Sequence, residues 1–188
     1  MKRLVQKLQR HARPLWLLKR AWLRLCGVEI GRGARIAPGA QVKRQGGRIV
    51  IGPDCTIHDG ARLLAAGGSI VLGRNCSVNP GCILYGHGGL TVGDDVRMAA
   101  YTVLVPANHR FDDPARPICE QGESREGIQV GNDVWFGIGA VVLDGVRVAD
   151  GCVVGAGAVV ARSTEPMGIY VGNPARRVRD RGAASQRR

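Results

Sequence analysis

Apolar residues recur along this chain at every sixth position. From Val130 to Val160, six consecutive units of six residues each begin with an apolar residue. The same spacing holds in four earlier groups of three units, and the step between these groups lengthens to eight or nine residues. The first positions of the units are Ile30, Ile36, Val42, Ile51, Ile57, Leu63, Leu72, Val78, Leu84, Val92, Met98, Leu104, Val130, Phe136, Val142, Val148, Val154 and Val160. Glycine often stands at the second position, as in Gly52 and Gly137.

A six-residue unit is too short for a hairpin and has the wrong period for an α-helix. Three short extended segments, with a bend after each, close one triangular coil, and stacked coils bury the first-position side chains in a continuous core. Each buried aliphatic side chain contributes ~1.5–3 kcal/mol. The pattern therefore predicts an all-β parallel solenoid, whose two open ends need caps.

Four of the six cysteines, Cys55, Cys76, Cys82 and Cys152, fall at the fifth position of a unit, where alanine or valine stands in many of the other units. This register predicts small buried side chains without a redox or metal role. Cys26 and Cys119 lie outside the pattern, and neither has the spacing of a zinc ligand.

Positive charge is concentrated at the two ends of the chain. The net charge is +12, residues 1–25 contain eight Lys or Arg and no acid, and residues 176–188 contain six Arg and one Asp. The remainder is nearly neutral, so the chain lacks the basic face of a nucleic-acid-binding domain. No stretch approaches the ~20 apolar residues of a membrane-spanning helix.

Residues 1–26 form a basic, amphipathic helical segment in this interpretation. Leu15, Leu18, Trp22 and Leu25 share one helix face. We expect this face to pack against the body or a neighbouring subunit. The alternative is peripheral contact with an anionic membrane surface.

One long segment interrupts the repeat. Residues 105–129 depart from it, and an excursion loop is expected at about 108–128. Such a long insertion in a regular solenoid is usually functional. It carries His109, a residue type that exchanges protons near neutral pH, although a structural histidine on a loop is the alternative.

The run "VGNDVWFGIGAVVLDGV" at 130–146 and the ending "VGNPARRV" at 171–178 add a family signature. Together with the repeat, they resemble the hexapeptide-repeat acyltransferases, in particular the maltose and galactoside O-acetyltransferases and the polysaccharide-biosynthesis O-acetyltransferases. The resemblance covers roughly residues 28–180. It implies a left-handed parallel β-helix at 27–165, a C-terminal cap and basic tail at 166–188, and a homotrimer with each active site between two subunits.

The resemblance also implies roles for individual residues. His109 corresponds to the catalytic histidine and Asn79 to a sugar-contacting asparagine, whereas His87 stands where the galactoside enzyme has an acidic residue. Asn108 is assigned to the substrate side, and Asn108, Asp112 and Asp113 are candidates to orient His109. The residues assigned to the acyl donor, acetyl-CoA, are Trp135, Ile138, Gly139, Ala156, Arg162, Pro174, Arg176 and Arg179.

The activity expected from this resemblance is transfer of an acetyl group from acetyl-CoA to a hydroxyl of a sugar or glycan precursor. His109 would act as general base in a direct attack, without a metal, in a cytoplasmic or membrane-peripheral protein. One rival is a zinc carbonic anhydrase of the same fold. The histidines His58, His87 and His109 are 29 and 22 residues apart, and the pair five apart expected for that class is absent. The other rival is a non-catalytic scaffold.

Overall fold

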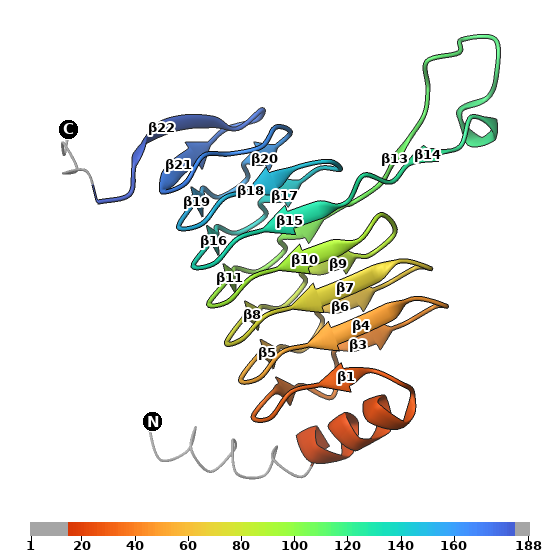
Figure 1. The fold of residues 1–188 in the computed structure, drawn as a ribbon, viewed down its shortest axis with the longest axis vertical. Coiled ribbons are helices and arrows are strands. Elements are labelled where there is room, and N and C mark those ends of the chain that lie inside the picture. The colour runs from red at the N-terminus through yellow and green to blue at the C-terminus, as the bar shows by residue number, and fades with distance from the viewer. Residues whose placement is uncertain (1–14, 183–188) are drawn as a thin grey trace.

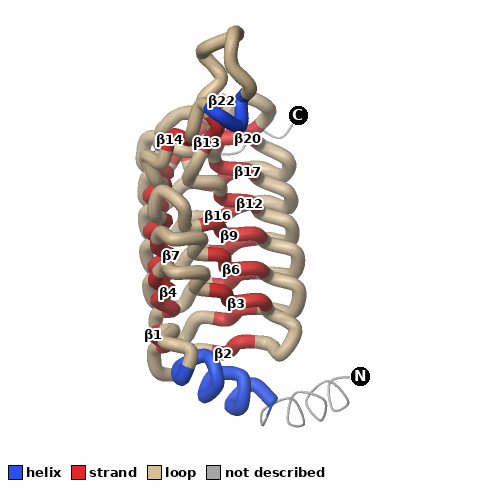
Figure 2. The backbone as a smooth tube through the Cα atoms, turned by 90° about the vertical axis from the view of Figure 1, so that its right-hand side faces the viewer, coloured by secondary structure: helices blue, strands red, loops and turns tan. Residues whose placement is uncertain are grey.

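A computed structural model describes residues 15–182. A helix covers residues 15–25, and the chain then winds through a parallel solenoid with three flat sheets (Figures 1 and 2). The first sheet contains β1 (Glu29–Ile30), β4 (Arg48–Ile51), β7 (Ser69–Leu72), β10 (Leu90–Val92), β15 (Ile128–Val130) and β18 (Arg147–Val148). The second contains β2 (Arg35–Ile36), β5 (Thr56–Ile57), β8 (Ser77–Val78), β11 (Arg97–Met98), β16 (Trp135–Phe136), β19 (Val153–Val154), β21 (Gly168–Val171) and β22 (Arg176–Asp180). The third contains β3 (Gln41–Lys43), β6 (Arg62–Leu64), β9 (Ile83–Tyr85), β12 (Val103–Leu104), β17 (Val141–Val142) and β20 (Val159–Val160).

Successive coils are in register, so equivalent positions of the repeat stack on one another. In the second sheet, for example, Met98 pairs with Val78 on one side and with Phe136 on the other. The pairing is parallel between coils, and only β22 joins the second sheet antiparallel, beside β21. This architecture agrees with the predicted left-handed parallel β-helix of hexapeptide repeats.

The chain turns between sheets at three kinds of corner. We call the corner between the first and second sheets the first corner, that between the second and third sheets the second corner, and that between the third and first sheets the third corner. The coils approach closely at the corners. A Cβ on Gly52, at the first corner, would lie 2.1 Å from the carbonyl oxygen of Gly73 in the next coil. The glycines of the repeat thus permit the close stacking of backbones.

The core confirms the periodicity. Of the eighteen first-position residues, seventeen are buried, and Ile30, in the first coil, is half-buried. The four cysteines at the fifth position are also buried as free thiols, while Cys26 and Cys119 are exposed. Burial raises the pKa of the Cys82 thiol, so its neutral form is favoured. These cysteines therefore act as small core residues.

Both ends of the described solenoid are covered. The helix at 15–25 lies across the first coil (Figure 1). Its Leu23 side chain is completely buried. At the other end, β22 pairs with β21, and Arg177 forms ion pairs with Glu165 and Asp180. Leu15, Leu18, Trp22 and Leu25 are exposed, so this face does not pack against the body of the same chain, and its packing against a neighbouring subunit stays a prediction. Within residues 15–182, no helix has the length and apolar character needed to cross a bilayer.

Candidate functional site

The excursion between β12 and β15 begins and ends as a two-stranded ribbon. β13 (Asn108–His109) pairs antiparallel with β14 (Glu123–Ser124), so Asn108 is opposite Ser124 and His109 is opposite Glu123. A short 3-10 helix, η1 (Ile118–Glu120), lies in the distal part of the loop, which projects away from the solenoid (Figure 1). The ribbon fixes the backbone of His109 at the third corner, close to the body of the protein.

Asp144 anchors the returning strand of this ribbon. Its carboxylate accepts a hydrogen bond from the Ser124 hydroxyl at 2.8 Å and others from the backbone N–H groups of Glu126, at 3.2 Å, and Gly127, at 2.9 Å. Asp144 lies in the third corner of the next coil, between β17 and β18. The root of the excursion is therefore tied to the solenoid by a charged acceptor, which makes stronger hydrogen bonds than a neutral one.

His109 and Asn108 are both exposed. Within residues 15–182, no carboxylate forms a hydrogen bond with the His109 ring. The Asp113 carboxylate instead accepts from the backbone N–H of Ala115 at 3.0 Å. Of the three candidates to orient the imidazole, none does so within the single chain.

The residues predicted for the acceptor are divided between two corners. Asn79 lies at the second corner, where its side-chain amide donates to the Met98 carbonyl at 2.7 Å. His87 lies at the third corner, on the same side as His109, and its ring centroid is 5.4 Å from that of Tyr85. The buried Nδ1 atom of His87 has no hydrogen-bond partner. A single chain thus places Asn79 and His109 at opposite edges of the third sheet.

Most residues predicted for the acyl donor lie on the side of the second sheet and second corner. Trp135 is on the outer face of β16 with 54% of its surface exposed, and Ile138, Gly139 and Ala156 occupy the second corner of successive coils. Pro174 lies in the turn between β21 and β22. Arg176 and Arg179 follow in β22, whereas Arg162 lies apart from the rest, just after β20 at the third corner.

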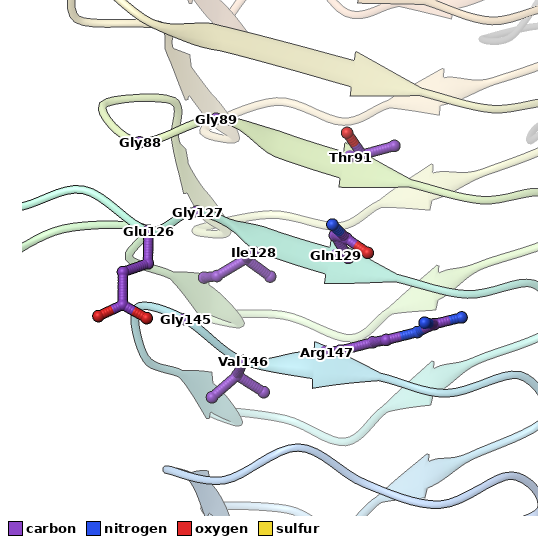
Figure 3. Close-up of a pocket in the computed structure, with 10 residues that line it drawn as sticks. All are labelled: Gly88, Gly89, Thr91, Glu126, Gly127, Ile128, Gln129, Gly145, Val146 and Arg147. Atoms are coloured by element: carbon purple, nitrogen blue, oxygen red, sulfur yellow. The ribbon is translucent and has the colours of Figure 1, made fainter.

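A pocket of about 360 Å³ lies beside the root of the excursion, on the outer face of the first sheet (Figure 3). Thr91, Gln129 and Arg147 project from neighbouring strands in register, and Glu126 closes one side. The remaining lining residues are Gly88, Gly89, Gly127, Ile128, Gly145 and Val146. The sequence analysis did not predict this pocket. Thr91, Gln129 and Arg147 each stand just before the first position of a unit, and this repeated polar position could have indicated a polar outer surface.

The possible metal ligands of the described residues are dispersed. Among residues 15–182, no group of three or more His, Cys, Asp or Glu side chains is arranged to hold a metal ion. The histidines His58, His87 and His109 are distributed over the second and third corners of different coils.

Parts of the chain are similar in sequence to known transferases. Residues 127–162 match the family model described as bacterial transferase hexapeptide (six repeats). A probable acetyltransferase of Mycobacterium tuberculosis is 37% identical over 92 residues, which are 49% of this chain and 31% of that protein. A chloramphenicol acetyltransferase of Agrobacterium fabrum is 36% identical over 78 residues, or 42% of this chain and 35% of that protein. The chain thus spans about a third of the length of these two curated relatives.

Solved structures extend the similarity to most of the fold. A mutant of AntD, an N-acyltransferase from Bacillus cereus in complex with dTDP and coenzyme A, superimposes with a TM-score of 0.76. The identity is 24%, over 86% of this chain and 89% of that one. A galactoside acetyltransferase in complex with coenzyme A gives a TM-score of 0.54 at 23% identity, over 77% of this chain and 66% of that one. These likenesses establish the fold, and with the matched repeats and the acetyltransferase relatives they confirm that the chain is similar to the hexapeptide-repeat acyltransferases.

Proposed function

We propose that this chain is an acetyl-CoA-dependent O-acetyltransferase that acts on a hydroxyl of a sugar or glycan precursor. The observation that carries the proposal is His109, which a paired ribbon holds at the point where the excursion leaves the hexapeptide body. The relatives named as acetyltransferases support the reaction class. AntD, solved with a nucleotide and coenzyme A, and the galactoside enzyme support the sugar acceptor and the acyl donor.

The surroundings of His109 suit a general base. Its exposed imidazole can take the proton of an acceptor hydroxyl while the hydroxyl oxygen attacks the acyl carbonyl. The acyl donor supplies an activated carbonyl with a thiolate leaving group, so the ester forms as the carbon–sulfur bond breaks. His109 then returns its proton to the departing sulfur, which balances the reaction. The pocket beside the excursion offers hydroxyl, amide, carboxylate and guanidinium groups that fit an acceptor rich in hydroxyls.

The C-terminal end of the solenoid suits the nucleotide end of coenzyme A. Arg176 and Arg179 lie in β22, the last strand of the second sheet, and Trp135 is exposed on β16 of the same sheet. Guanidinium groups bind phosphate oxygens well, and an exposed indole can pack against a neutral arm. We assign these residues, with Ile138, Gly139, Ala156, Arg162 and Pro174, to the donor.

The division of the site between two corners supports a homotrimer. The second-corner residues and His109 lie at opposite edges of the third sheet, so one chain does not form a common site from them. Around a threefold axis, the second corner of one chain can face the third corner of its neighbour. Each complete site would then contain residues from two chains.

Replacing His109 tests the catalytic role. The substitution His109→Ala should lower kcat by ~10²–10⁴ with little change in the donor KM, because it removes the proton acceptor. The activity is measured with acetyl-CoA and a panel of sugars, amino sugars and glycan precursors, and mass spectrometry locates the acetyl group. His58→Ala is the control, since His58 lies at the second corner of an earlier coil. Activity of His109→Ala within about tenfold of the unsubstituted protein would remove His109 as the base.

Replacing Arg176 tests the donor site. The substitution Arg176→Ala should raise the KM for acetyl-CoA by roughly tenfold, because one charge-assisted contact to phosphate is worth about 1.5–3 kcal/mol in binding and is partly screened at an exposed position. Steady-state kinetics at varied donor concentration measure this effect. The neighbouring Arg177→Ala is the matched control, since Arg177 is occupied by Glu165 and Asp180. An equal effect of both substitutions would argue against a specific donor contact.

Replacing Asp144 tests whether the anchor positions His109. Asp144→Ala should lower kcat by roughly 3–30-fold, because a small displacement of the base is costly, while the donor KM stays nearly constant. Hydrogen exchange of the Glu126 and Gly127 amides should become faster in the same variant. Asp150→Ala is the control, because Asp150 accepts from the backbone N–H of Asn132 at the first corner, away from the excursion. Faster exchange with an unchanged kcat would show that the anchor is structural only.

A further inference from the structure

The helix at 15–25 presents an unpartnered apolar face. Leu15, Leu18, Trp22 and Leu25 are separated by three, four and three residues, which places them on one side of the helix. Their exposed fractions are 53%, 67%, 55% and 88%. Large apolar side chains gathered on one exposed helix face mark an interaction surface more often than scattered single residues do.

The opposite side of the helix is already occupied. Leu23 is completely buried against the first coil, and Trp16 and Arg20 are half-buried beside it. The end of the helix is fixed by a hydrogen bond from the Arg24 guanidinium to the Ile30 carbonyl at 2.6 Å and by one from the Val28 N–H to the Leu23 carbonyl at 3.0 Å. The exposed face therefore cannot turn into the core unless Leu23 is unpacked.

The segment that carries this face is basic in sequence, and its charged residues within 15–28 are Lys19, Arg20 and Arg24. Residues 1–28 contain eight Lys or Arg and no acidic residue, and the next residue, Glu29, is paired with Arg48 at 2.9 Å. The ammonium group of Lys19 lies 5.2 Å from the centroid of the Trp22 ring, so charge and apolar surface adjoin. A second copy of this helix would bring like charges together, whereas an anionic surface would be attracted.

We propose that the exposed face of the helix at 15–25 docks the protein on an anionic lipid membrane. Apolar side chains enter the boundary between head groups and acyl chains, while adjacent Lys and Arg side chains contact anionic head groups. The helix lies at one end of the solenoid, and the excursion projects near the other end (Figures 1 and 2). Docking at this end leaves the third corner and the excursion accessible.

The position of the helix also sets the distance between a docked membrane and the proposed active site. The excursion leaves after β12, in the fourth coil of the stack. At ~4.8 Å per coil, His109 lies roughly 15–20 Å from the end that carries the helix. An acceptor attached to a lipid by a linker of that length would reach it. The docking proposal itself does not depend on the acetyltransferase activity.

Co-sedimentation of the 188-residue chain with vesicles tests the proposal. We expect binding to vesicles of equal parts phosphatidylcholine and phosphatidylglycerol, little binding to phosphatidylcholine alone, and release by salt. The double substitution Leu18→Ala/Trp22→Ala should lower the partition constant at least about tenfold, because it removes buried apolar area. Lys19→Gln should lower it about fivefold, because one charge near the surface is lost.

Matched controls come from the excursion. Phe111 and Ile118 are exposed there to 70% and 54%, so Phe111→Ala/Ile118→Ala removes comparable apolar surface, and Arg110→Gln removes one exposed charge. Both controls should leave vesicle binding unchanged, and the melting temperature of each variant checks its fold.

Failure of the unsubstituted protein to bind anionic vesicles would overturn the proposal, as would equal loss of binding in the controls. A third outcome would assign the face to a second copy of the chain. In that case the protein does not bind vesicles but self-associates with rising concentration, and Leu18→Ala/Trp22→Ala abolishes the self-association.

Discussion

The burial of one apolar side chain every six residues is the constraint on which the structure depends. A single coil cannot shield these side chains or satisfy its own backbone hydrogen bonds, so each coil needs a neighbour above and below it. Stacking in register then fixes the outward positions as well. Trp135, for example, pairs with Arg97 and Val153 because Phe136 is packed between Met98 and Val154. The core thus determines where the corner residues of the regular repeat lie.

This constraint explains why the proposed site is divided. Because the repeat is regular, Asn79, Ile138 and Ala156 lie at the second corner and His87 lies at the third. The excursion adds His109 to the third corner, and Asp144 of the next coil anchors its root. A rigid stack does not bend to bring two edges of a sheet together. A complete site built from these residues therefore requires a neighbouring chain, and the same rigidity would present both halves in a constant geometry.

Much of the fold could be predicted from the sequence, because inward positions repeat and leave a periodic signal. Phe136 and Cys152 are buried where the register places them. The apolar face of the helix was also identified, but periodicity does not tell whether such a face meets the body, a neighbouring subunit or a membrane, and Leu23 of another face is the residue buried in the chain. The ribbon of β13 and β14 and the anchor at Asp144 were missed for another reason. They join residues about 15 to 20 positions apart through side chains and backbone groups that follow no repeat.

Mixing two inactive variants tests the central claim most directly, namely that each active site contains residues of two chains. One variant carries His109→Ala, and the other carries Ala156→Trp, which fills the exposed second corner with a bulky side chain. The chains are unfolded and refolded together in equal amounts. A site is then complete when its histidine comes from the Ala156→Trp chain and its second corner from the His109→Ala chain, which happens in about one case in four. We predict recovery of about a quarter of the activity of the unsubstituted protein. A mixture no more active than the average of the separate variants would contradict the account.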